Sequence, residues 1–193
     1  MKRLVLAAFV LNLATLPAFA ALKAGDTAPQ FNAQASLAGK TFNYSLKKAL
    51  KKGPVVVYFY PSSFTGGCNI QAHTFAVDSD QFKALGATII GVSLDSIDRL
   101  NDFSKDPEYC AGKFPTASDA DGKIAKSYDL KVADSHPGLK DTRGVDIDHG
   151  FAERTTFIVT ADGKIADTIG GLAPAENVDH ALAAVRALTA KNQ

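Results

Sequence analysis

The sequence has little cysteine, no tryptophan and almost no net charge. Its two cysteines, Cys68 and Cys110, are too far apart for a CxxC pair, and its four histidines share no spacing typical of metal sites. These absences argue against a zinc site and against a thiol-disulfide oxidoreductase or a copper-delivery protein with paired ligands. The 21 basic residues nearly cancel the 20 acidic ones, so charge gives no reason to expect a nucleic acid or an anionic membrane as partner.

The N-terminal apolar stretch is too short to span a bilayer. It covers Leu4–Leu16, which is 13 residues, whereas a transmembrane helix needs about 20. It follows two basic residues and leads to the small-residue site Ala18, Phe19 and Ala20. This pattern predicts a secretory signal peptide over residues 1–20, cleaved after Ala20. We therefore expect a periplasmic or secreted protein without a membrane anchor, in a compartment where two cysteines can form a disulfide.

The remaining residues, 21–193, suit a single domain. Within them, Val55–Tyr60 is a continuous β-branched and aromatic run bounded by prolines, which predicts a strand buried on both faces. A second apolar run, Thr88–Leu94, is separated from the first by a segment with Phe75 and Phe82 at helical spacing. A strand, a helix and a strand in this order predict a parallel pair.

Turn signals and apolar stripes predict the other elements. Phe31–Ala35 and Thr41–Tyr44 flank a turn and predict an N-terminal hairpin at the edge of the sheet. Thr155–Thr160 and Lys164–Ile169 flank an Ala-Asp-Gly turn and predict a second hairpin. Helices are expected over Ser96–Ser104, around Lys123–Tyr128 and along the stripe Val178, Leu182, Val185 and Leu188, with a loop over Ala133–Gly150. This order predicts an α/β fold with a mixed central sheet and helices on both faces.

Cys68 lies where the strand Val55–Tyr60 turns into the next helix, in the first helical turn. Free amide groups and the helix macrodipole stabilise an anion there, so a thiolate is favoured. Gly66 and Gly67 let a small ligand approach the backbone amides closely. The hydroxyl of Thr65 can accept a hydrogen bond from a helix amide or donate one to an oxygen atom over the sulfur. The sequence therefore predicts a site for a small two-oxygen substrate at Cys68.

Two motifs resemble those of the peroxiredoxin family. In the segment Tyr58–Cys68, a Pro, a Thr four residues later and a Cys three residues after that follow an apolar strand. The segment Glu153–Ile158 is similar to the family's second motif, in which an Arg faces the peroxidatic Cys. The order of elements is also similar to the thioredoxin-like fold of this family, which belongs to the AhpC/TSA superfamily. The local spacing most resembles its bacterioferritin-comigratory, or PrxQ-like, branch.

The resemblance implies a thiol-dependent peroxidase and antioxidant enzyme. Cys68 would attack the terminal oxygen of hydrogen peroxide or an organic hydroperoxide and become a sulfenic acid. Thr65 and Arg154 would hold the peroxide oxygens, and Pro61 would shield the site from solvent. No metal, haem or flavin cofactor is implied. An external dithiol reductant, either a thioredoxin-like protein or a low-molecular-weight thiol, would reduce the oxidised enzyme.

Three positions bear on how the resemblance applies. Gln71 stands where many members of the branch have Glu, which keeps the hydrogen-bonding ability but loses the charge. His73 stands where one subgroup has its resolving Cys, so that route is closed. Cys110 lies in the region where another subgroup has its resolving Cys, and flanking Pro and Gly residues fit a segment that can unwind. The resemblance therefore implies that Cys110 resolves Cys68 by an intramolecular disulfide.

Other interpretations of the two cysteines stay open. One is a permanent disulfide between Cys68 and Cys110, worth about 4 kcal/mol on the chain-entropy model, in a non-catalytic thioredoxin-like binding or chaperone domain. Another is a one-cysteine peroxidase in which Cys110 is a bystander. The oligomeric state is open between monomer and dimer.

We assign no catalytic role to the remaining polar residues. Aspartates near turns, among them Asp95 and Asp119, are expected to be helix caps or solvated residues. His73 is expected on a helix surface. His149 is given no role, because the histidines lack a metal-site spacing.

Overall fold

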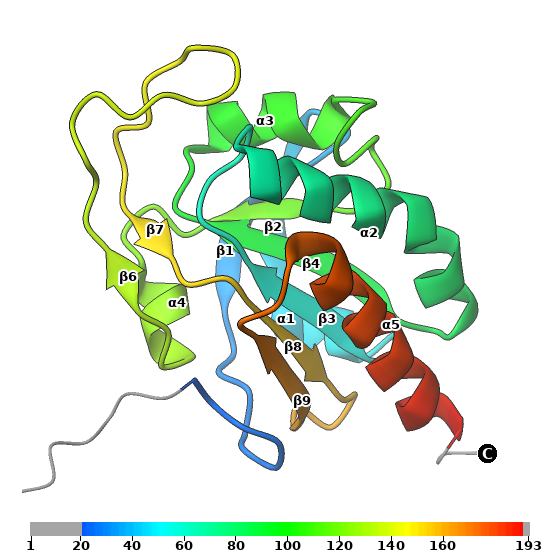
Figure 1. Ribbon diagram of the computed structural model, residues 1–193. Helices are drawn as coiled ribbons and strands as arrows, with labels where there is room; N and C mark the ends of the chain where they lie inside the picture. Colours follow the sequence, from blue (N-terminus) through cyan, green and yellow to red (C-terminus); the bar gives the residue numbers. More distant parts are fainter. Residues whose placement is uncertain (1–20, 191–193) are drawn as a thin grey trace, which may run out of the picture.

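A computed structural model describes residues 21–190 as a mixed sheet with helices on both faces (Figure 1). The predicted signal peptide, residues 1–20, lies outside the described residues, as do residues 191–193. The seven strands of the main sheet follow the order β2-β1-β5-β4-β3-β8-β9. The β3–β4 and β4–β5 pairs are parallel, and the other neighbours are antiparallel.

The strands of this sheet are β1 (Asn32–Leu37), β2 (Lys40–Ser45), β3 (Val55–Phe59), β4 (Thr88–Ser93), β5 (Thr116–Ser118), β8 (Thr155–Val159) and β9 (Ile165–Gly170). A separate antiparallel pair consists of β6 (Val132–Ala133) and β7 (Phe151–Ala152). The helices are α1 (Leu46–Leu50), α2 (Gly66–Ala84), α3 (Ile97–Lys105), α4 (Lys123–Ser127) and α5 (Pro174–Ala190). The mixed sheet, both hairpins and the parallel β3-α2-β4 unit confirm the predictions.

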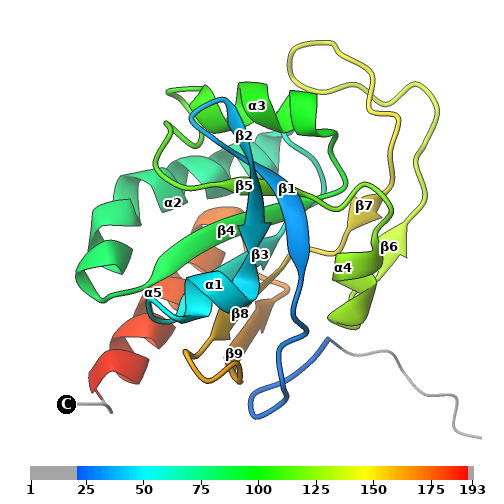
Figure 2. The same cartoon turned by 180° about the vertical axis from the view of Figure 1, so that it is seen from behind.

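β3 is buried on both faces, as its sequence predicts. All five of its residues are buried. Because successive side chains of a strand point to opposite faces, its odd-numbered residues join the core under α1 and α4, whereas Val56 and Tyr58 join the core under α2 and α5. Figure 2 shows α1 and α4 in front of the sheet, and Figure 1 shows α2 and α5 in front of the opposite face. The central strand therefore joins two hydrophobic cores.

Gly91 of β4 allows the ring of Tyr58 to lie against the sheet. The two residues are cross-strand partners, and a Cβ atom at position 91 would lie 2.7 Å from the Tyr58 hydroxyl oxygen. The ring of Tyr58 also stacks on Phe75 of α2, with 4.6 Å between the ring centroids. A residue without a side chain at position 91 is thus required for this packing of α2 on the sheet.

The sequence does not predict three short features of the fold. These are α1, β5 and the β6–β7 pair, whose elements have between two and five residues. Elements of that length show no periodicity, and β5 forms because β1 and β4, distant in sequence, lie on either side of it. The predicted loop over Ala133–Gly150 is confirmed except at Ala133, which pairs in β6. Among residues 21–190, no helix is both long enough and apolar enough to cross a membrane.

Candidate active site

Cys68 lies at the start of α2, after the loop that connects β3 to this helix. Thr65 is the N-cap residue, with extended backbone angles, and the helix begins at Gly66. Cys68 is therefore in the first turn, as predicted, and its side chain is buried with only 2% exposure. The amides of this turn have no partners within the helix and favour negative charge on the sulfur.

Arg154, the residue before β8, contacts Cys68. β8 pairs with β3 so that Thr155 is opposite Phe59, which brings Arg154 just beyond the end of β3, beside the start of α2. The Nη2 atom of Arg154 donates a hydrogen bond to Sγ of Cys68 over 3.3 Å. The structure thus brings together the two residues that the two sequence motifs singled out.

The guanidinium of Arg154 is fixed by Gln71, one turn further along α2. Nη1 of Arg154 donates to Oε1 of Gln71, and Nε2 of the fully buried Gln71 donates to Oδ1 of Asn177 in α5 over 3.0 Å. Thr156 donates to the same Asn177 oxygen over 2.6 Å, and Nδ2 of Asn177 donates to the carbonyl of Ile169. Gln71 therefore orients Arg154 while contributing no charge. Nothing in the local sequence of Asn177 points to the site, and Thr156 lies in the motif Glu153–Ile158 but received no role of its own from the sequence.

Glycine at position 67 leaves room for this arrangement. A Cβ atom there would lie 3.2 Å from Nη2 of Arg154 and 3.2 Å from Cγ of Pro174, whereas a Cβ atom at Gly66 would meet nothing within 4 Å. The two adjacent glycines thus differ in function. Gly67 makes space for the arginine, and Gly66 does not.

The hydroxyl of Thr65 does not cap α2, so that alternative for its role is wrong. It donates instead to the carbonyl oxygen of Ser62 over 2.8 Å and closes the loop in front of the helix. Pro61, at the start of this loop, is half-buried. Both residues lie in the loop that carries the chain from β3 to Cys68.

Cys110 is buried more completely than Cys68, and both thiols are free. It lies after α3 in a turn segment held to that helix by the hydrogen bond from Gly112 N to Ser104 O, 2.9 Å long. Both cysteines belong to the core under α2 and α5. Burial, with a smaller contribution from Asp106, raises the pKa of the Cys110 thiol well above its ordinary value. Cys110 is thus a protonated, shielded thiol in this state.

The prediction that Asp95 is a helix cap or a solvated residue is wrong. Its side chain is fully buried, and its carboxylate accepts hydrogen bonds from Ser63 N over 2.8 Å and Ser62 Oγ over 3.0 Å. It also forms an ion pair with Arg99 at 2.9 Å. The surrounding hydrogen bonds outweigh the effect of burial and lower the pKa of Asp95, so it is ionised. This role of Asp95 becomes apparent only in the fold, because the pairing of β4 with β3 brings Asp95 beside the loop that follows β3.

The other residues considered from the sequence lie as follows. His73 is exposed on α2, as expected, and its Nδ1 lies 2.9 Å from the Glu108 carbonyl oxygen. Asp119 accepts hydrogen bonds from the amides of Ile124 and Ala125 and so caps α4, as expected. Within residues 21–190, no three His, Cys, Asp or Glu side chains gather in a way that could hold a metal ion.

Comparisons with known proteins agree with this geometry. Residues 24–168, three quarters of the chain, match the AhpC/TSA family. Peroxiredoxin Bcp of Escherichia coli is 31% identical over 144 residues, which are 75% of this chain and 83% of that protein. The matched region contains both motifs and both cysteines.

Solved structures show the same relationship. Peroxidoxin BcpB from Mycobacterium tuberculosis has a TM-score of 0.70 and 29% identity, over 86% of this chain and 97% of its own. The bacterioferritin comigratory protein of Xanthomonas campestris, described for its alkyl peroxide reduction activity, has a TM-score of 0.64 and 28% identity, over 81% and 91% of the two chains. These similarities confirm the thioredoxin-like fold. The chain belongs to the AhpC/TSA family, and it is a peroxiredoxin related to the bacterioferritin-comigratory, PrxQ-like branch.

Proposed function

We propose that this thiol-dependent peroxidase reduces hydrogen peroxide and organic hydroperoxides with Cys68 as its peroxidatic residue. The thiolate of Cys68 attacks the terminal peroxide oxygen and the O–O bond breaks. The sulfur becomes a sulfenic acid, and the departing alkoxide or hydroxide takes up a proton. The observation that carries this proposal is the hydrogen bond from Arg154 to the sulfur, 3.3 Å long.

Arg154 acts on both the sulfur and the substrate. Its Nη2 stabilises the thiolate, and its fixed positive charge favours negative charge on the departing oxygen. Gln71 holds the guanidinium in place without neutralising it. The hydroxyl of Thr65 gives up its hydrogen bond to the carbonyl oxygen of Ser62 and donates one to the peroxide instead. Pro61 shields the sulfenic acid from solvent.

Cys110 resolves the sulfenic acid. Its thiolate attacks the sulfur of Cys68, the S–O bond breaks and an S–S bond forms. The departing hydroxide takes up the proton that the Cys110 thiol released and leaves as water, and the two thiols together supply the two electrons that reduce the peroxide. Because Cys110 is fully buried, its segment must unwind from Ser104 before the sulfurs meet. Unwinding also exposes the thiol to water, which removes the desolvation that raises its pKa.

The predicted leader determines the compartment that we propose for the enzyme. With residues 1–20 as a cleaved leader, the enzyme acts in the periplasm or outside the cell. An external dithiol, a thioredoxin-like protein or a small thiol, reduces the disulfide and completes the cycle. The alkyl peroxide reduction described for the Xanthomonas campestris relative supports organic hydroperoxides as substrates beside hydrogen peroxide. The cycle uses no metal, haem or flavin, and the enzyme acts as a monomer or a dimer.

Mass spectrometry of the reduced protein after one equivalent of hydrogen peroxide tests this cycle. The wild-type mass falls by about 2 Da as the disulfide forms. The Cys110→Ser variant gains about 16 Da instead, and its sulfenic acid is trapped by dimedone. The Cys68→Ser variant keeps its mass.

Three results would count against parts of the proposal. Equal oxidation of the Cys68→Ser variant and the wild type would remove Cys68 from its role. A stable gain of one oxygen in the wild type would make Cys110 a bystander. A disulfide that is present in the resting protein and resists a thioredoxin couple would support the non-catalytic domain with a structural disulfide.

A further inference from the structure

The active-site loop Ser62–Thr65 is held from outside by residues 139–149, a segment that we call the strap. The backbone N and the Oγ1 of Thr142 both donate to the carbonyl oxygen of Phe64, each over 2.8 Å. The guanidinium carbon of Arg143 lies 3.2 Å from the centre of the Phe64 ring. Phe64 has a φ angle of 60°, in the left-handed region, which a bulky residue keeps only where its surroundings enforce it. The strap therefore restrains the residue immediately before Thr65.

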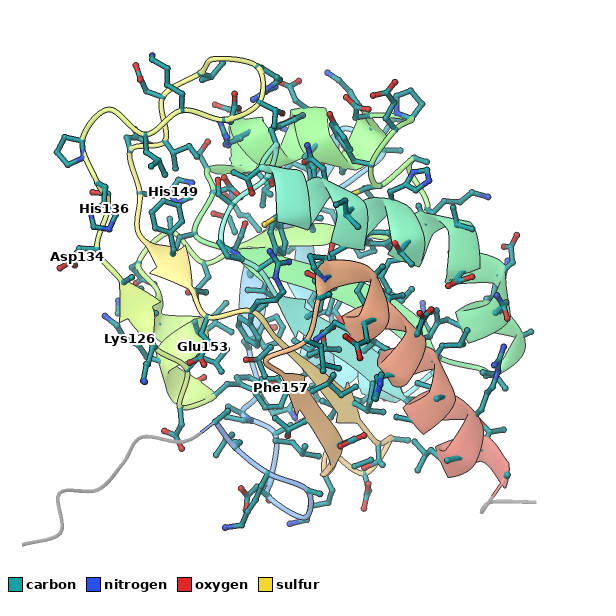
Figure 3. All side chains as sticks on the ribbon, in the orientation of Figure 1. Lys126, Asp134, His136, His149, Glu153 and Phe157 are labelled. Carbon is teal, nitrogen blue, oxygen red and sulfur yellow. The ribbon has the colours of Figure 1, made fainter. Side chains whose placement is uncertain are left out.

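The far end of the strap reaches the same loop through Asp95. The carboxylate of Asp95 binds Ser62 and Ser63 as described, and Nε2 of His149 lies 2.8 Å from its Oδ1. Figure 3 shows His149 on the segment that leads into β7, on the same side of the molecule as α3. One buried carboxylate thus joins the active-site loop to the strap.

The contacts of His149 define its protonation state. Its Nε2 lies 2.8 Å from Oδ1 of Asp95, with the Oγ of Ser62 further away at 3.4 Å, and its Nδ1 lies 2.8 Å from the carbonyl oxygen of Gly150. The carboxylate and carbonyl oxygens of the two short contacts only accept hydrogen bonds, so both ring nitrogens must donate to satisfy them. A neutral imidazole has one donor and one acceptor, and only the imidazolium satisfies both contacts.

The charged groups around His149 on balance favour the imidazolium, although the positive charge of Arg99 opposes it. Arg99 of α3 pairs with Asp95 and with Asp141 of the strap, and Arg143 also pairs with Asp141. Four further carboxylates line the cavity that His149, Arg99 and Arg143 share, and two of them pair with lysines. These carboxylates are Asp98, Asp102 (with Lys105), Asp146 (with Lys140) and Asp148. Carboxylates therefore outnumber the cations that face them.

We propose that protonated His149 is a positioning residue that ties the strap to Asp95 and so keeps Ser62–Thr65 in the conformation that presents Cys68 to peroxide. The proposal rests on the peroxidatic role of Cys68. When His149 loses a proton, a ring lone pair faces an acceptor oxygen atom and one of its two short contacts is lost. The loop then loosens, and Cys68 is oxidised more slowly.

The direction of the pH effect follows from Asp95. Burial by itself lowers the pKa of His149, but the hydrogen bond and charge of Asp95 outweigh burial and raise that pKa above 6.5. Stabilisation by the imidazolium is thus complete below the pKa of the unfolded chain and is lost as the pH rises through the higher pKa of the folded protein. Peroxide reduction should therefore have a descending limb at a pH above the ordinary pKa of histidine.

Competition with a haem peroxidase for hydrogen peroxide gives the rate constant of Cys68 oxidation at each pH. For the wild type, we expect the rate constant to fall about tenfold along the descending limb, because one charge-assisted hydrogen bond is lost. In the His149→Gln variant, whose amide does not titrate, the rate constant no longer falls with rising pH. The His73→Gln variant is the matched control, because His73 is exposed on α2, and it keeps the descending limb.

Nitrogen-15 NMR of the wild-type imidazoles provides a measurement that needs no folded variant. We expect His149 to carry protons on both ring nitrogens at the pH where the rate is maximal and to lose one over the pH range in which the rate falls. A neutral His149 at pH values where the rate is maximal, or a descending limb that persists in His149→Gln, would overturn the proposal. Undiminished peroxide reduction by Cys68→Ser would instead refute the proposed function itself, so the two failures are distinguishable.

Discussion

The Nη2 atom of Arg154 donates a hydrogen bond to the Sγ atom of Cys68 over 3.3 Å, although 86 positions separate the two residues in the sequence. The contact depends on the antiparallel pairing of β8 with β3 and on the turn from β3 into α2. It joins a sulfur at a helix N-terminus to a fixed fork of donors. The chemistry proposed for this peroxiredoxin depends on that geometry.

Replacement of Arg154 should slow peroxide reduction strongly. Arg154→Lys keeps the positive charge but loses the planar fork that contacts both Cys68 and Gln71. We expect the rate constant of Cys68 oxidation to fall about 100-fold, as for loss of one oriented donor at other active sites. Arg186→Lys, a change at an exposed position of α5, should leave the rate constant unchanged. A similar rate constant in all three proteins would show that Arg154 is not used.

The adjacent glycines should respond differently to the same substitution. A methyl group at position 67 meets Arg154 and Pro174, whereas a methyl group at position 66 meets open space. We expect Gly67→Ala to lower the rate constant of Cys68 oxidation at least tenfold by displacing the guanidinium. Gly66→Ala is the control and should react like the wild type. Equal behaviour of the two variants in stopped-flow or competition assays would contradict the required position of Arg154.

Gly91→Ala should destabilise the protein. Its Cβ atom would lie 2.7 Å from the hydroxyl oxygen of the buried Tyr58, so the ring must move off Phe75. We expect the free energy of unfolding, measured by urea titration, to fall by about 1–3 kcal/mol. In the double variant with Tyr58→Phe most of the loss should remain, because the ring carbon Cζ would also lie 2.7 Å from the new Cβ atom. An unchanged unfolding midpoint for Gly91→Ala would refute the close approach.

Cys110 should make stability depend on pH in the alkaline range. Its pKa is raised in the folded state by burial, so the folded protein holds the thiol proton more tightly than the unfolded chain does. The resulting contribution is present below the thiol's unfolded pKa and is lost as the pH rises above it. Under reducing conditions, the free energy of unfolding should therefore fall between about pH 8 and pH 9.5, before most tyrosines of the unfolded chain ionise. The Cys110→Ala variant should show a shallower fall, and an identical slope would contradict burial of a protonated thiol.

Local sequence predicts the parts of this protein that local physics determines. The composition of the run Val55–Tyr60 predicts its burial, and the turn over residues 61–67 that follows it predicts that Cys68 lies at a helix start. Arg154 could be assigned only through the family resemblance, because no local pattern says which strand β8 will join. The structure supplies that pairing.

The rest of the site depends on contacts between distant segments. Asp95 reads as a turn residue, yet the fold buries it beneath the loop after β3, where Ser62, Ser63 and His149 meet its carboxylate. Asn177 reads as an ordinary residue in the first turns of α5, yet it supports Gln71. A polar side chain is assigned to a core network only when the partners that satisfy it are known, and those partners are far away in the sequence.

Steady-state consumption of hydrogen peroxide with dithiothreitol as reductant tests the central claim most directly. The small dithiol can reduce a sulfenic acid without help from Cys110. We therefore predict that Cys68→Ser consumes no peroxide above the rate of dithiothreitol alone, whereas Cys110→Ser, matched to it in chemistry and also buried, retains activity. Peroxide consumption by Cys68→Ser at the wild-type rate would contradict the assignment of Cys68 as the peroxidatic residue.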